Sequence, residues 1–101
     1  MGVPKYTTPT FTLTFSEADL DLTQADNVYV TFRSGGEKLT KTGGDLTVGE
    51  KQIEVSLAQE ETAKFSSKVE IQANWMTGGK RFASAIAWAM IDGQLLNEVI
   101  P

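Results

Sequence analysis

The stretch from residue 80 to residue 91, KRFASAIAWAMI, is apolar on both sides when it is read as a β-strand. Successive side chains of a strand point to opposite faces of the sheet, so alternate positions share a face. One face would carry Phe82, Ser84, Ile86, Trp88 and Met90, and the other would carry Ala83, Ala85, Ala87, Ala89 and Ile91. Neither face suits water, so we expect this strand to be central and covered on both sides.

Shorter segments that read as strands precede this stretch. They lie at residues 10–15, 27–33, 37–42, 45–48, 52–57 and 68–76. Glycine pairs at 35–36, 43–44 and 78–79 separate several of these segments, and glycine adopts the positive φ of tight hairpin turns without a steric penalty. Residues 58–65, AQEETAKF, break the alternation and are rich in helix-forming residues, so they predict one short helical turn.

Short strands with turn signals at regular spacing are typical of a β-sandwich. We therefore predict an all-β fold, an immunoglobulin-like antiparallel β-sandwich of about seven strands with one helical turn near 58–65. A small closed barrel fits the same spacing. The predicted core consists of inward residues of these strands, namely Phe11, Phe15, Val30, Phe32, Val69, Ile71 and Trp75. Trp75 and Phe82 are expected to lie near each other across the last hairpin.

A chain of 101 residues is long enough for one hydrophobic core and predicts a single domain over residues 1–101. Within it, residues 1–9 are an expected extended lead-in and residues 92–101 a C-terminal tail. The hydrophobic content of 41% and the charged content of 22% are ordinary for a globular protein. The N-terminus lacks the apolar segment of a signal peptide, so we expect the mature chain to begin here, in the cytosol, and not to involve a membrane.

The composition argues against an enzyme. The chain has no His and no Cys, which removes the most frequent general base and the thiol nucleophile. Glu60 with Glu61, or Asp19 with Asp21, would need to be held across a sugar cleft to act as a glycosidase pair, whereas they lie in polar segments. We therefore predict no catalytic residue and no cofactor.

Carboxylates cluster before the second strand, at Glu17, Asp19, Asp21 and Asp26. Clustered oxygens are the ligands that calcium prefers, but the spacing and the glycine of a calcium loop are absent. The cluster is interpreted as a charged surface loop, and no metal site is predicted. Residues 77–80, TGGK, lack the spaced first glycine of a phosphate loop and are interpreted as a hairpin turn.

Nucleic acid is not an expected partner of this chain. The net charge is -4, and affinity for nucleic acid comes mainly from neutralising phosphates with Lys and Arg. Lys80 and Arg81 beside Trp75 and Phe82 are the residue types that stack on single-stranded bases. Two cations do not form a groove, however, and the alternation predicts that both rings are buried.

The alanine face of residues 80–91 is the candidate interface, and two interpretations stay open. The helix and the tail of the same chain could cover it, or its small residues could allow a second subunit or domain to approach closely. The candidate interface comprises Ala83, Ala85, Ala87 and Ala89, together with Leu95, Leu96, Val99 and Ile100 of the tail.

Four segments that cover most of the chain resemble a known family. They are TTPTFTLTF (7–15), DLTQADNVYVTF (21–32), LAQEETAKFSSKVEIQANWM (57–76) and FASAIAWAMIDGQLLNEVI (82–100). They are similar to small proteins of phages and prophages of Gram-positive bacteria that look like the N-terminal domain of the baseplate upper protein, an immunoglobulin-like module. The block from QEETAKF to WMTGGKRFAS is the distinctive part of the shared pattern.

The resemblance implies a non-enzymatic structural or adaptor module of a phage or prophage virion, in the tail or baseplate. Such a module would be made in the bacterial cytoplasm and would dock other virion proteins or copies of itself. The alternative is a carbohydrate- or cell-wall-binding module of a host-recognition apparatus. That function needs aromatic residues on a wet surface, for which the candidates are Tyr6, Tyr29 and one Trp.

Overall fold

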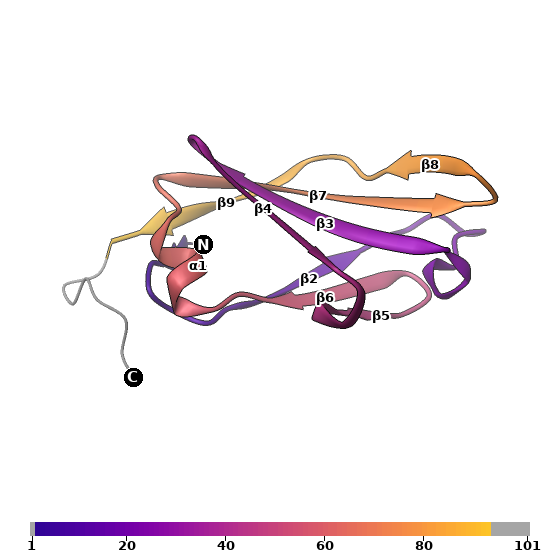
Figure 1. The fold of residues 1–101 in the computed structure, drawn as a ribbon, viewed down its shortest axis with the longest axis horizontal. Helices are drawn as coiled ribbons and strands as arrows, with labels where there is room; N and C mark the ends of the chain where they lie inside the picture. Colours follow the sequence, from indigo (N-terminus) through magenta and orange to yellow (C-terminus); the bar gives the residue numbers. More distant parts are fainter. Residues whose placement is uncertain (1, 94–101) are drawn as a thin grey trace.

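A computed structural model describes residues 2–93 of the chain, and in this part the protein is mostly β-structure (Figure 1). The strands are β1 (Gly2–Pro4), β2 (Thr10–Thr14), β3 (Asn27–Ser34), β4 (Glu37–Thr42), β5 (Leu46–Val48), β6 (Gln52–Ser56), β7 (Lys68–Thr77), β8 (Lys80–Ala83) and β9 (Ala87–Asp92). The helices are the 3-10 turns η1 (Leu22–Gln24) and η2 (Gly43–Asp45) and the short helix α1 (Gln59–Ala63).

The strands form two sheets that face each other (Figure 1). The larger sheet has six strands in the order β1-β9-β7-β3-β4, with β8 also paired to β7. The smaller sheet has three strands in the order β2-β6-β5. All pairs are antiparallel except β1 with β9, which run parallel. The larger sheet is therefore mixed, and the prediction of a purely antiparallel arrangement is wrong at β1.

The core lies between the sheets and uses the inward side chains of both. Val30, Phe32 and Val69 of the larger sheet are fully buried, as are Ile53 and Val55 of the smaller one. Aromatic rings join the layers. The ring centre of Phe32 lies 5.4 Å from that of Phe11 and 6.2 Å from that of Phe65. The ring centres of Trp75 and Phe15 are 5.6 Å apart. The predicted core is confirmed, although Phe11 and Phe15 are only half-buried at its edge.

The predicted helical turn is confirmed as α1, which lies at one end of the molecule between the two layers (Figure 1). Ala58 has no side-chain acceptor for the first N–H groups of the helix, but its own N–H donates to Glu61 Oε1 at 2.7 Å. Thr62 is buried and donates its hydroxyl to the carbonyl of Thr7 at 2.9 Å. The helix thus fixes the segment before β2.

Residues 2–93 form nine strands where about seven were expected. One additional strand, β1, comes from the lead-in, where the Lys5 N–H also donates to the carbonyl of Asp92 at 2.8 Å. The other arises because residues 80–91 form two strands instead of one. β8 and β9 pair with different parts of the same edge of β7.

The segment that joins β8 to β9 contains one residue more than the part of β7 that lies opposite it. Trp75 is paired with Phe82, and Ile71 is paired with Ala87, so four steps along β7 correspond to five steps along its partner. This is a β-bulge at residues 84–86, and an odd insertion reverses which side chains face the core. Phe82 shares the core side with Trp75, but beyond the bulge the core side belongs to Ala87, Ala89 and Ile91.

The bulge corrects the predicted orientation of the last strand. Both faces of residues 80–91 were expected to be covered, yet Trp88 and Met90 are 62% and 46% exposed, and Ile86 in the bulge is 52% exposed. Phe82 lies against Trp75 as expected, with the rings 6.1 Å apart, but it is 44% exposed at the end of the core. β9 therefore has a solvent-exposed side, which carries its large residues Trp88 and Met90.

Candidate protein-docking face

The four alanines of the candidate interface do not share one surface. Ala83 is paired with Asn74, whose side chain lies on the outer side of the larger sheet. Ala87 and Ala89 are opposite Ile71 and Val69 and lie on the core side. Ala85 lies in the bulge, and Leu95, Leu96, Val99 and Ile100 lie outside the described residues. The alternation that grouped the alanines ends at the bulge, and their role in an interface stays a prediction.

The bulge is held by hydrogen bonds from β7. The Ser84 N–H donates to the carbonyl of Ala73 at 2.9 Å, and Ser84 Oγ accepts from the Ala73 N–H at 3.0 Å. Gln72 Nε2 donates to the carbonyl of Ser84 at 2.9 Å, and Asn74 Nδ2 donates to the carbonyl of Phe82 at 3.3 Å. The serine hydroxyl therefore takes the place of a backbone acceptor where the regular pairing is interrupted.

The exposed Trp88, which follows the bulge, ends a row of side chains that crosses the outer side of the larger sheet. Lys38 on β4 is paired with Arg33 on β3, Arg33 with Glu70 on β7, and Glu70 with Trp88 on β9. Directly opposed residues lie about 4.5–5.5 Å apart at their Cβ atoms, close enough to interact. One row thus places a lysine, an arginine, a glutamate and a tryptophan side by side on four strands.

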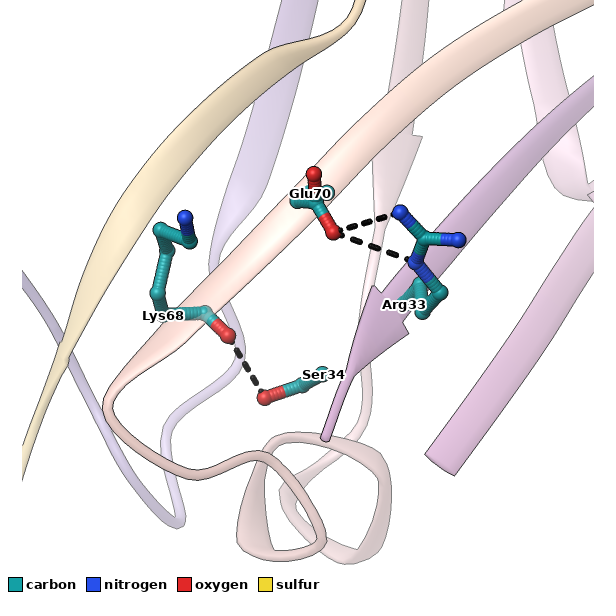
Figure 2. Close-up of polar contacts among 4 residues, drawn as sticks. All are labelled: Arg33, Ser34, Lys68 and Glu70. Carbon is teal, nitrogen blue, oxygen red and sulfur yellow. Dashed lines mark hydrogen bonds and ion pairs between the residues drawn. The ribbon is translucent and has the colours of Figure 1, made fainter. Parts of the chain in front are cut away.

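An ion pair between Arg33 and Glu70 lies in the middle of this row. Arg33 Nε and Nη2 both donate to Glu70 Oε1, at 3.1 and 2.8 Å (Figure 2). The hydrogen bond from the guanidinium lowers the pKa of the Glu70 carboxyl below its ordinary value. The Lys68 ammonium lies 6.0 Å from the centre of the Trp88 ring, a cation–π contact. The glutamate and the tryptophan are therefore held in place at the surface.

The next residue of β3 points the opposite way (Figure 2). Ser34 is buried, and its hydroxyl lies 2.9 Å from the carbonyl of Ser66 and 2.7 Å from that of Lys68. The hydroxyl also accepts from the Ser66 N–H at 2.9 Å. This network ties the end of β3 to the start of β7, so it fixes the register that sets Arg33 opposite Glu70.

Two shallow depressions lie on this outer side. One of about 210 Å³ is lined by Thr31, Arg33, Lys38, Glu70, Ile71, Gln72, Asn74, Arg81 and Ile86. The other, of about 310 Å³, is lined by Tyr29, Thr31, Thr40, Asn74, Trp75, Met76 and Arg81. They share Thr31, Asn74 and Arg81 and so form one continuous region. We call the outer side of β4, β3, β7, β8 and β9, with the Ile86–Trp88–Met90 strip, the outer face.

Sequence reasoning missed the central residues of the outer face. Arg33 and Glu70 directly follow the predicted core residues Phe32 and Val69, so alternation places them outward, but nothing along the chain indicates that they pair. Trp88 was expected to be covered, like the rest of residues 80–91, because the bulge was not recognised. The one signal for the bulge was Ser84, a polar residue inside an apolar run whose hydroxyl can replace a backbone partner.

Two of the acidic residues considered as metal ligands have structural contacts. Asp21 caps η1 by accepting from the Thr23 N–H at 3.0 Å, and Asp26 accepts from the Gly78 N–H at 3.3 Å. Gly78 and Gly79 both have positive φ, as the predicted hairpin turn requires. Among residues 2–93 no group of three or more acidic side chains is placed to hold a metal ion.

Comparison of the chain with protein-family models, with curated proteins and with solved structures finds no match. No helix within the described part of the chain is long and apolar enough to cross a membrane.

Proposed function

We propose that this protein is a non-enzymatic docking module that binds another protein through the outer face. The observation that carries the proposal is the exposure of Ile86 in the bulge together with Trp88 and Met90 on β9. Contiguous exposed apolar side chains are typical of interaction sites, and tryptophan and arginine are the residue types most enriched where binding energy concentrates. The Arg33–Glu70 pair next to Trp88 would fix the orientation of a partner.

The strand order supports an immunoglobulin-like arrangement for this module. In such sandwiches strands B, E and D form one sheet, and strands G, F, C and C′ form the other. The order β2-β6-β5 fits the first sheet, and β9-β7-β3-β4 fits the second. The helix α1 then lies in the connection between β6 and β7, the strands that match E and F. The outer face would then be the exposed side of the sheet that contains strands G, F and C.

The proposed setting is the tail or baseplate of a phage or prophage virion, and it rests on the sequence resemblance. The partner would be another virion protein or a further copy of the chain. The outer face is a sheet surface, which is the kind of surface by which modules of this family are expected to dock.

Co-expression tests the proposal. The chain is produced with each tail or baseplate protein encoded beside its gene, and complexes are isolated by affinity purification and size-exclusion chromatography. We expect one of these proteins to co-purify, and Trp88→Glu to abolish the complex. Thr12→Glu, an exposed residue on the smaller sheet, is the matched control and should leave the complex intact. The proposal fails if no neighbour binds, or if Trp88→Glu and Thr12→Glu behave alike.

A second candidate function, carbohydrate or cell-wall binding, is favoured by the same exposed tryptophan. Trp88 would stack on a sugar ring, and the polar side chains that line the neighbouring depression of about 210 Å³ would form hydrogen bonds with the sugar. Titration with cell-wall polysaccharide, followed by tryptophan fluorescence, distinguishes the two. A saturable change that is lost in Trp88→Ala supports this function, and an unchanged spectrum excludes it for the polysaccharide used.

A further inference from the structure

The depression of about 210 Å³ on the outer face, which we call the groove, is basic, although the protein is acidic. Arg33, Lys38 and Arg81 line it, and Glu70 is the single carboxylate among its lining residues. The whole chain has 9 basic and 13 acidic residues. The groove thus gathers three of the nine basic residues around one carboxylate, which reverses the charge balance of the molecule.

The positive charge of the groove is not neutralised within the described chain. Glu70 is already engaged by Arg33. Lys38 and Arg81 make no ion pair with any residue in 2–93, where the ion pairs are Arg33–Glu70 and Lys41–Glu61. Two exposed cations therefore stand free on either side of an arginine–glutamate pair. Asp92, at the far end of β9, is the other acidic residue on the outer side and does not line the groove.

Apolar side chains border this charge. Ile86 lines the groove itself, and Trp88 is paired with Glu70 on the neighbouring strand. A ligand that neutralises Lys38 and Arg81 and also covers Ile86 and Trp88 must carry both anionic and apolar groups. A face-to-face second copy would bring the same cations against each other, and like charges in contact are unfavourable. A long polyanion such as nucleic acid would be opposed by the net charge of -4.

We propose that the outer face binds an acidic polypeptide segment of a different protein, whose carboxylates meet Lys38 and Arg81 while apolar side chains cover Ile86 and Trp88. This inference rests on the proposed docking function and names the chemistry of the partner. The charged groups would speed association and reject basic or neutral partners, and the apolar strip would supply most of the affinity.

The experiment titrates the isotope-labelled full chain with a synthetic peptide of about ten residues, long enough to span several strands of the sheet, in which glutamates flank a central phenylalanine. Binding is followed by amide chemical shifts in NMR spectra. We expect shifts on β7, β8 and β9, and affinity that falls about ten-fold or more in Arg81→Gln. Thr12→Glu, which changes the net charge by the same amount on the smaller sheet, should change affinity less than about two-fold. Arg81→Lys should retain most of the binding.

Several results would overturn the inference. The first is equal binding of a matching peptide in which lysines replace the glutamates. Tighter binding of a single-stranded oligonucleotide, or no shifts on the outer face with the acidic peptide, would also contradict it. A mass that rises with protein concentration and falls in Arg81→Gln would identify a second copy of the chain as the occupant. The proposed function has a separate readout. A co-purified partner that depends on Trp88 but binds equally well in about 0.05 M and about 0.5 M salt would leave docking intact and refute the acidic partner.

Discussion

Single hydroxyl groups fix the strand pairs on which the outer face depends. Ser34 holds β3 to the start of β7, and Ser84 holds the bulge to the middle of β7. Ser34 is 2% exposed, so water cannot replace it if its hydroxyl is removed. A buried group that loses its partner costs about 1–3 kcal/mol.

Replacing Ser34 with alanine should therefore lower the free energy of unfolding by about 1–3 kcal/mol, because the Ser66 N–H and the Lys68 carbonyl lose a buried partner. Chemical denaturation measures the change. Ser16→Ala, at an exposed serine, is the control and should stay within about 0.5 kcal/mol of the unchanged protein. Equal effects of the two substitutions would contradict the role of the Ser34 network.

At the scale of elements, α1 is tied to β4 by one carboxylate. Glu61 Oε2 lies 2.7 Å from Lys41 Nζ, and Glu61 Oε1 accepts from the Ala58 N–H. Burial raises the pKa of the Glu61 carboxyl, but the hydrogen bonds from Lys41 and Ala58 outweigh burial, with a smaller contribution from the charge of Lys64. The pKa of Glu61 in the folded protein therefore lies below its ordinary value of 4.5.

A lowered carboxyl pKa gives stability that is present above the unfolded-state pKa and is lost as the pH falls through the folded-state pKa. We expect Glu61→Gln to reduce the free energy of unfolding at pH 7 by about 0.5–1 kcal/mol and to reduce the loss of stability below about pH 4.5. Denaturation measured across this pH range checks both effects. Glu60→Gln, at the exposed neighbour, should alter neither, and an unchanged pH profile in Glu61→Gln would refute the linkage.

The bulge decides which side of β9 is exposed to solvent. Deleting Ala85 would remove the extra residue and turn Trp88 and Met90 toward the core, into space that Ala87 and Ala89 occupy. We expect the deletion to lower the free energy of unfolding by about 2 kcal/mol or more, as overpacked cores do. Ala85→Ser keeps the length and should have a small effect. A deletion variant of unchanged stability would show that the register is not set by the bulge.

Much of the fold could be predicted because its strands carry a clear alternation. Val30, Phe32, Val69 and Ile71 were assigned to the core, and the helical turn was placed, from periodicity alone. The outer face could not be predicted in the same way, because alternation propagates an error beyond any inserted residue. One unrecognised bulge near Ser84 leaves Trp88 on the surface, where a covered position was expected. β1 was missed because a parallel pair leaves no local turn signal.

At the scale of the whole molecule, the protein has two outer surfaces of different character. The smaller sheet presents polar residues, Thr10, Thr12 and Thr14 on β2 and Glu54 on β6, to the outside. The larger sheet presents an apolar strip beside a basic groove. Only the second surface combines the two properties that protein partners use, so the difference between the sheets gives the molecule a docking side.

The accessibility of Trp88 shows whether the outer face is exposed in the free protein and covered in the complex. In Trp75→Phe, Trp88 is the only tryptophan, and its fluorescence can be quenched with acrylamide in the free protein and in the complex with a co-purified partner. We predict strong quenching in the free protein and protection in the complex. Weak quenching in the free, folded protein would place Trp88 in the core, and unchanged quenching in the complex would mean that the partner binds elsewhere.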